Sequence, residues 1–159
     1  MKKSKILSAL LCLTLVFSVC LAGCGSKEEK PEEEKLSCSI TVTAADVLEN
    51  EDLIAPEKLE LVPEDGIIYS GTVEFEEGDT LYSVLTEALS DEKVQFEAEN
   101  SSYFVAFGNI YASDCEYGGW LYSVNGVEPT VGANEYKLAD GDSVEFFYVC
   151  DYNAYYSAA

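Results

Sequence analysis

The stretch from Gly118 to Gly126 concentrates the residue types best suited to binding a flat organic molecule. It holds the only tryptophan, Trp120, with Tyr122 two residues later and Gly118 and Gly119 just before it. Aromatic side chains offer apolar area with a polar end, and glycines let another group approach the backbone. Tyr117 would add a third ring. A packed core needs the same residues, so both interpretations stay open at this point.

Groups that could catalyse a reaction are scarce. The chain has no His, which removes the commonest general base and zinc ligand, and leaves Cys115 without an imidazole to activate its thiol. Glu74 and Glu76 alternate with apolar residues, which indicates a solvated strand face rather than a catalytic carboxylate pair. Asp140-Gly141-Asp142 lacks the spacing of an EF-hand loop and predicts a turn. We therefore expect neither an enzyme nor a metal site.

Hydrophobic periodicity predicts several strands around one helix. Apolar patterns predict strands within residues 38–44, 67–69, 72–76, 94–98, 103–107, 120–124 and 144–149, and residues 103–107 are apolar on both faces, as in a central or covered strand. Asp79 is the expected N-cap of a helix whose apolar residues recur at helical spacing from Leu81 to Leu89. Residues 46–62 are expected to form a loop with one short helical turn. This pattern predicts an α+β fold with the helix packed on one sheet face.

The first residues have the pattern of an export signal. Three lysines precede an apolar run over residues 6–19, which is too short to span a bilayer comfortably. Leu21-Ala22-Gly23-Cys24 then resembles the bacterial lipobox, which implies cleavage before Cys24 and acylation of its thiol. A plain secretory signal or a single membrane anchor is the alternative. We predict a signal peptide (1–23), an acidic flexible tether (24–35), one folded domain (36–150) and a tail (151–159) that extends the last strand or frays.

The charge of the exported chain is strongly negative. All thirty acidic residues follow Cys24, whereas three of the nine lysines precede it, so cleavage leaves a formal net charge of −24. Nucleic acids and anionic headgroups attract cationic surfaces, so neither is an expected partner. The charge instead favours a neutral or cationic ligand.

Three segments together resemble a family of bacterial surface domains that is similar to the C-terminal β-domain of transcobalamin and intrinsic factor. They are residues 71–81, which read GTVEFEEGDTL, residues 119–126, which read GWLYSVNG, and residues 132–142, which read GANEYKLADGD. The resemblance implies a β-grasp-like fold, a mixed sheet packed on one helix, as a single domain. In the cobalamin carriers this domain covers one face of the corrin, and the helical domain that holds the other face is not expected here.

The resemblance also implies binding positions. They are Trp120, Tyr122 and the loop of Gly132, Asn134 and Tyr136, to which the residue types add Tyr117, Gly118 and Gly119. With Tyr111, these tyrosines could form an aromatic patch facing a sugar or a corrin; the alternatives are core packing and a partner interface.

Three cysteines follow the tether, so at least one stays unpaired in any disulfide scheme. In a β-grasp sheet the first and last strands are parallel neighbours, which would place Cys38 and Cys150 at opposite ends. If the Trp120 strand runs antiparallel to the last strand, the start of the Trp120 strand, where Cys115 lies, comes near Cys150. We expect a Cys115–Cys150 disulfide.

The sequence thus leads to a lipid-anchored module on the extracellular face of the bacterial membrane that binds a small soluble ligand. No cofactor is certain, and a cobalamin-type corrinoid is the most concrete ligand. The alternative is a surface module that docks another envelope protein through a strand edge and its tyrosines.

The lipobox yields the first prediction. Cys24→Ala removes the thiol that would be acylated, so the variant should be released from membranes or should stay unprocessed. Fractionation with mass determination of the N-terminus measures both, and Cys38→Ala is the matched control. A Cys24→Ala chain that is cleaved at the same place and still membrane-bound would rule out lipidation.

Overall fold

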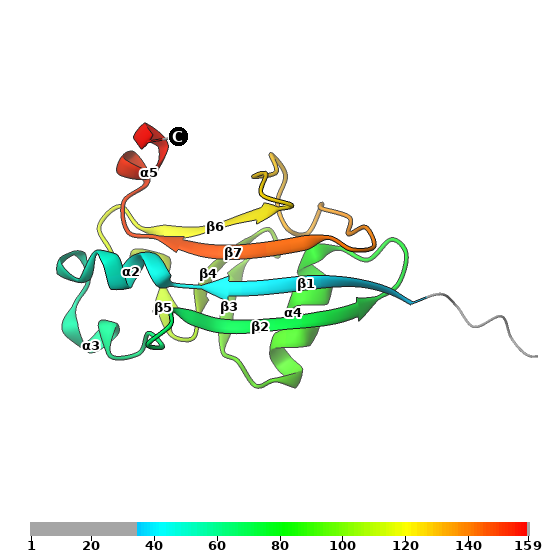
Figure 1. Cartoon of the computed structure of the whole chain (residues 1–159), viewed down its shortest axis with the longest axis horizontal. Coiled ribbons are helices and arrows are strands. Elements are labelled where there is room, and N and C mark those ends of the chain that lie inside the picture. Colours follow the sequence, from blue (N-terminus) through cyan, green and yellow to red (C-terminus); the bar gives the residue numbers. More distant parts are fainter. Residues whose placement is uncertain (1–34, 159) are drawn as a thin grey trace, which may run out of the picture. The chain divides into compact units, whose positions relative to one another are not determined.

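A four-stranded mixed sheet in the order β2-β1-β7-β6 forms the centre of the fold (Figure 1). The structure is a computed structural model that describes residues 35–158. The predicted signal peptide, Cys24 and the predicted tether up to residue 34 lie outside the described residues. Within residues 35–158 we find no helix whose length and hydropathy would suit a bilayer crossing.

The strands are β1 (Leu36–Thr43), β2 (Ile67–Phe75), β3 (Phe96–Glu99), β4 (Tyr103–Phe107), β5 (Ile110–Tyr111), β6 (Gly119–Val124) and β7 (Ser143–Val149). The helices are α2 (Ala45–Glu49), α3 (Pro56–Leu59), α4 (Leu81–Asp91) and α5 (Tyr152–Ala158), with 3-10 turns η1 (Glu51–Leu53) and η2 (Ala112–Asp114).

The first and last strands of the sheet are parallel neighbours, as the β-grasp resemblance implies. Ile40 pairs with Val144 and Val42 with Phe146 in the parallel β1–β7 ladder. β2 runs antiparallel to β1, and β6 runs antiparallel to β7. On the inner face of β1, Cys38, Ile40 and Val42 are apolar and buried, whereas the outer face carries Ser and Thr. This alternation is what fixes the register, because a one-residue slip would bury the hydroxyls.

Helix α4 and the three-stranded sheet β3-β4-β5 both lie against the inner face of the four-stranded sheet (Figure 1). The buried residues of α4 are Leu81, Val84, Leu85, Ala88 and Leu89. Each fully buried leucine contributes about 1.5–3 kcal/mol relative to an exposed one. The predicted α+β fold with one helix packed on a sheet face is confirmed.

The start of α4 differs from the sequence expectation by one residue. Thr80, not Asp79, is the N-cap, and its hydroxyl accepts from the backbone N–H of Ser83 at 3.1 Å while the Ser83 hydroxyl accepts from Thr80 N. Asp79 instead accepts from the N–H of Glu76 at 3.0 Å and closes the preceding turn. Serine at the third helical position can reach back as Glu does in a capping box, which is why spacing alone misplaced the cap.

Two segments are more regular than their sequences suggest. Residues 46–62, expected as a loop with one helical turn, hold two short helices and a 3-10 turn. Strand β2 continues through Gly71, because the ring of Tyr69 folds over the glycine and its hydroxyl would lie 2.6 Å from an added Cβ. The glycine therefore makes room for a side chain and does not break the strand.

The tail is the largest departure from expectation. It neither extends β7 nor frays but forms helix α5, whose first turn is capped by Asp151, the carboxylate accepting from Asn153 N and Ala154 N. The Tyr152 N–H also donates to the carbonyl of Tyr117 at 2.9 Å. Cap residues of this kind stabilise a helix by about 1 kcal/mol.

Helix α5 explains one of the two glycines before Trp120. An added Cβ on Gly119 would overlap the hydroxyl of Tyr152. We predict that Gly119→Ala lowers the free energy of unfolding by about 1–3 kcal/mol through overpacking. Tyr152→Ala removes the obstructing ring, so Gly119→Ala should cost far less in that background, as measured by denaturant unfolding of all four chains. Equal costs in both backgrounds would contradict this packing account.

Candidate functional site

A pocket of about 230 Å³ lies at the edge of β6, between the β3–β4 turn and the segment from Glu128 to Gly132. We call it the β6-edge pocket. Trp120, Tyr122 and Gly132, three of the predicted binding positions, line it. The remaining lining residues are Ser102, Tyr103, Phe104, Leu121, Glu128, Pro129, Val131, Phe146 and Tyr156.

Trp120 is both core and pocket wall. Only 2% of it is exposed, its indole N–H donates to the carbonyl of Ile110 at 3.1 Å, and its ring packs edge-on against Phe107 and Tyr148. The two interpretations of Trp120 are therefore compatible, since one edge of a core residue reaches the pocket. Because the position of Trp120 is fixed by the core, this wall of the pocket is rigid.

Tyr122 is held in place by packing and by its hydroxyl. Its ring stacks on Phe146 at 5.2 Å and meets Tyr136 edge-on, and its hydroxyl donates to the carbonyl of Val131 at 2.6 Å. Burial, followed by the neighbouring Tyr136, raises the pKa of Tyr122 to about 12. Tyr122 thus links strand β6 to the segment from Glu128 to Gly132, through Val131.

The loop of Gly132 to Tyr136 is anchored by the N-terminus of α4. The N–H groups of Leu81 and Tyr82 donate to the carbonyls of Tyr136 and Ala133, both at 2.9 Å. These helix N–H groups have no partner within the helix, so the loop satisfies them. The Gly132 carbonyl in turn accepts from the N–H groups of Glu135 and Tyr136, so the carbonyls of Gly132, Ala133 and Tyr136 are all used to hold the loop.

Asn134 carries an unpaired acceptor at this site. Its Oδ1 is buried and has no hydrogen-bond partner among residues 35–158. Asn134 does not itself line the pocket, but an added Cβ on Gly132 would lie 2.9 Å from this oxygen and 3.0 Å from Ser102 Cβ, so the oxygen lies behind two residues that do. Leaving a buried acceptor unpaired costs about 1–3 kcal/mol, which a donor on a ligand or a water would recover.

The other predicted positions lie apart from the pocket. Gly118 and Gly119 do not admit a ligand: an added Cβ on Gly118 would lie 2.5 Å from the Tyr148 hydroxyl, and Gly119 faces Tyr152. The protein's own tyrosines fill the space that the glycines leave open. Tyr117 is 53% exposed at the start of β6, and Tyr136 packs beneath Tyr122. Residue type alone could not show which neighbour occupies that space.

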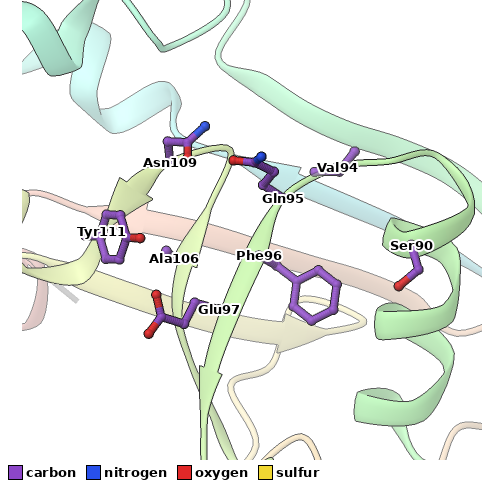
Figure 2. Close-up of a pocket in the computed structure, with 8 residues that line it drawn as sticks. All are labelled: Ser90, Val94, Gln95, Phe96, Glu97, Ala106, Asn109 and Tyr111. Carbon is purple, nitrogen blue, oxygen red and sulfur yellow. The ribbon is translucent and has the colours of Figure 1, made fainter.

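Tyr111 belongs to a separate hollow of about 330 Å³ on the three-stranded sheet (Figure 2). There Glu97, Ala106 and Tyr111 are cross-strand neighbours, with the small Ala106 in the middle. The Lys58 ammonium lies 4.9 Å from the centre of the Tyr111 ring and pairs with Asp114 at 3.1 Å. Because Lys58 already covers that ring, Tyr111 is not part of a single aromatic patch with Trp120.

The structure brings Cys115 and Cys150 together as free thiols. Burial, followed by the neighbouring Cys115 thiol, raises the pKa of Cys150. All three cysteines of the described residues are reduced and buried, and burial raises the pKa of Cys38 to about 11. The predicted antiparallel pairing of β6 with β7 produces this juxtaposition. The disulfide itself stays a prediction.

Comparison with known proteins agrees with this fold. Residues 78–149 match the model of a domain of unknown function, DUF4430. Haptocorrin in complex with cobinamide (Cbi) is structurally similar, with a TM-score of 0.52 and 15% identity over 73% of this chain and 25% of haptocorrin. A candidate metal-binding protein from Ruminococcus gnavus ATCC 29149 gives a TM-score of 0.41 and 18% identity over 71% of this chain and 95% of its own. No curated protein matches in sequence.

The DUF4430 and haptocorrin matches show what the domain resembles. The chain carries an α+β domain of unknown function that resembles the transcobalamin-type β-domain, as the three sequence segments implied. It spans about a quarter of haptocorrin, and the likeness extends to the fold. The DUF4430 match covers α4, the second sheet and the β6–β7 hairpin, which together include most of the β6-edge pocket.

Tyr122→Phe tests the hydrogen bond by which Tyr122 on β6 holds the segment that contains Val131. Losing the bond to Val131 should lower the free energy of unfolding by about 1 kcal/mol at pH 7. The folded state holds the Tyr122 proton more tightly than the unfolded chain does, so its stabilising effect is full below pH 10 and is lost as pH rises through about 12. Between pH 7 and 12 the free energy of unfolding should therefore fall less steeply with pH for Tyr122→Phe than for the unchanged chain. Tyr117→Phe, at an exposed ring, is the control, and identical curves for both variants would refute the assignment.

Proposed function

We propose that this chain is a lipid-anchored extracellular module that binds a small neutral or cationic molecule in the β6-edge pocket, with a corrinoid as the leading candidate. The observation that carries the proposal is the buried, unpaired Asn134 Oδ1 beside a pocket with aromatic walls. Apolar walls with a few placed polar groups are typical of small-molecule sites. A corrinoid offers both a broad apolar face and amide N–H donors.

The similarity to haptocorrin, which was solved with cobinamide, supports the choice of ligand to be tested first. The net charge of −21 for the whole chain disfavours anions, and Glu128 adds a carboxylate to the pocket wall. Binding rather than catalysis is the proposed activity, because the pocket residues with shifted pKa values are Tyr122 and Tyr156, and burial raises the pKa of both so that they stay protonated.

A second candidate is docking of an envelope protein over the same pocket. Exposed apolar side chains stand around it: Tyr103 is 38% exposed, Val131 41% and Tyr156 55%. Grouped exposed apolar residues of this kind mark interaction surfaces in many proteins. Such a partner would cover the pocket instead of filling it.

Titration of cobinamide, cobalamin and a panel of neutral glycans separates the two candidates. Trp120 is the only tryptophan and forms a wall of the pocket, so a bound ligand should change its fluorescence. Tyr103→Ala should weaken binding about tenfold, which is about 1.4 kcal/mol. Tyr111→Ala removes a ring of nearly equal exposure outside the pocket and should leave affinity unchanged. Saturable binding that both variants weaken equally, or no binding at all, would favour the docking candidate.

A further inference from the structure

A second groove runs over the outer face of the four-stranded sheet, with a volume of about 450 Å³. Its floor comes from three adjacent strands, through Thr43 on β1, Phe147 on β7 and Ser123 on β6. Helices α2 and α5, which meet the same end of the sheet in Figure 1, supply its sides. Phe146 and Phe147 point to opposite faces of β7, so this groove and the β6-edge pocket are separate sites.

The groove is lined by carboxylates and by no lysine. Asp46, Glu128 and Glu145 face it. Three of the four lysines in residues 35–158 have partners elsewhere: Lys35 with Glu74, Lys58 with Asp114, and Lys137 with the carbonyl of Gly78. The negative field inside the groove is therefore not neutralised by the chain itself, and it attracts cations.

Ser123 gives independent support for a ligand. The residue is 8% exposed, lines the groove, and its hydroxyl makes no hydrogen bond with any residue the structure describes. Within residues 35–158 the buried side-chain atom without a partner is Asn134 Oδ1, so the Ser123 hydroxyl is not sealed in the core and opens onto the groove. Its hydroxyl can accept from an ammonium or amine group that enters the groove.

The aromatic side of the groove suits an alkyl chain. The rings of Phe147 and Tyr155 lie 5.7 Å apart at 46° and form an apolar corner. The Tyr155 hydroxyl is already engaged, because it donates to Glu128 at 2.7 Å. Methylene groups would pack on these rings, and a nearby ammonium would gain from their faces.

The spacing of the carboxylates excludes a compact ion as the best occupant. Within residues 35–158 no three metal-ligating side chains converge. The Asp46 carboxylate lies beside Cys150, because it accepts from the Cys150 N–H at 2.7 Å. Glu145 precedes Cys150 by five residues, which is about 16 Å along an extended strand, so the two carboxylates lie far apart. Glu128 and Glu145 both lie near Tyr155. The groove therefore has one carboxylate, Asp46, toward one end and two, Glu128 and Glu145, toward the other.

We propose that this groove binds a linear polyamine, with an ammonium group near Asp46, another near Glu145 and Glu128, and methylenes over Phe147 and Tyr155. Ser123, the cross-strand partner of Glu145, accepts from the ammonium group at the Glu145 end. This activity is independent of the proposed function, because the two sites share only Glu128 among their side chains.

The test is calorimetric titration of the full chain with spermidine, putrescine and hexaamminecobalt(III). Spermidine should bind saturably at one site and more tightly than the cobalt complex, which has the same charge but no alkyl chain. Equal affinity for the two trivalent cations would overturn the proposal in favour of general counterion attraction, and so would the absence of saturable spermidine binding.

Charge-matched variants locate the site. Glu145→Gln removes an exposed carboxylate from the groove and should weaken spermidine binding about fivefold or more, as expected for a lost charge-assisted hydrogen bond. Glu99→Gln makes the same change at an exposed position on β3, away from the groove, and should change affinity less than about twofold. Thermal unfolding of both variants checks the fold. Equal weakening by both would overturn the proposal, whereas the corrinoid titration does not depend on this result.

Discussion

The parallel pairing of β1 with β7 is the constraint on which the rest of the structure depends. It joins residues 39–43 to residues 143–147, about a hundred positions apart in the chain. Every other strand of the larger sheet attaches to one of these two. Long-range pairing has a high cost in chain entropy, which must be offset by apolar burial on the inner face. Ile40, Val42, Val144 and Phe146 provide that burial.

The aromatic core links this strand pairing to the wall of the β6-edge pocket. Phe146 contacts Phe104, Phe107 and Tyr122, and Phe107 contacts Trp120. These rings join the two sheets and end at the β6-edge pocket. A ligand in the pocket would therefore meet side chains whose positions are fixed by the core, which lowers the entropy cost of binding.

Helix α5 and Glu128 lie where the two proposed sites approach each other. Glu128 accepts from Tyr155 at 2.7 Å and from Tyr156 at 3.0 Å. Tyr155 lines the outer groove and Tyr156 lines the β6-edge pocket. A single carboxylate thus holds the helix that forms part of both walls, and the sheet between them keeps the two volumes separate.

The sequence by itself determined the fold class, the helix α4 and most strands, because alternation and helical spacing record which side chains face the core. It also predicted Trp120, Tyr122 and Gly132 as binding positions, and the structure places these three on the β6-edge pocket; their binding role stays a prediction. Cap details such as Thr80 and the short helices of residues 45–59 were missed, since their local signals are weak.

Only the tertiary structure decided what each chemically suited residue does. It showed that the tyrosines at 148 and 152 fill the space beside Gly118 and Gly119, that Lys58 covers Tyr111, and that Asn134 Oδ1 stays unpaired. These facts depend on which distant segments meet, and a residue's type does not specify its neighbours. The outer groove has the same origin: Asp46, Ser123 and Tyr155 come together because the sheet order and helix α5 place them there.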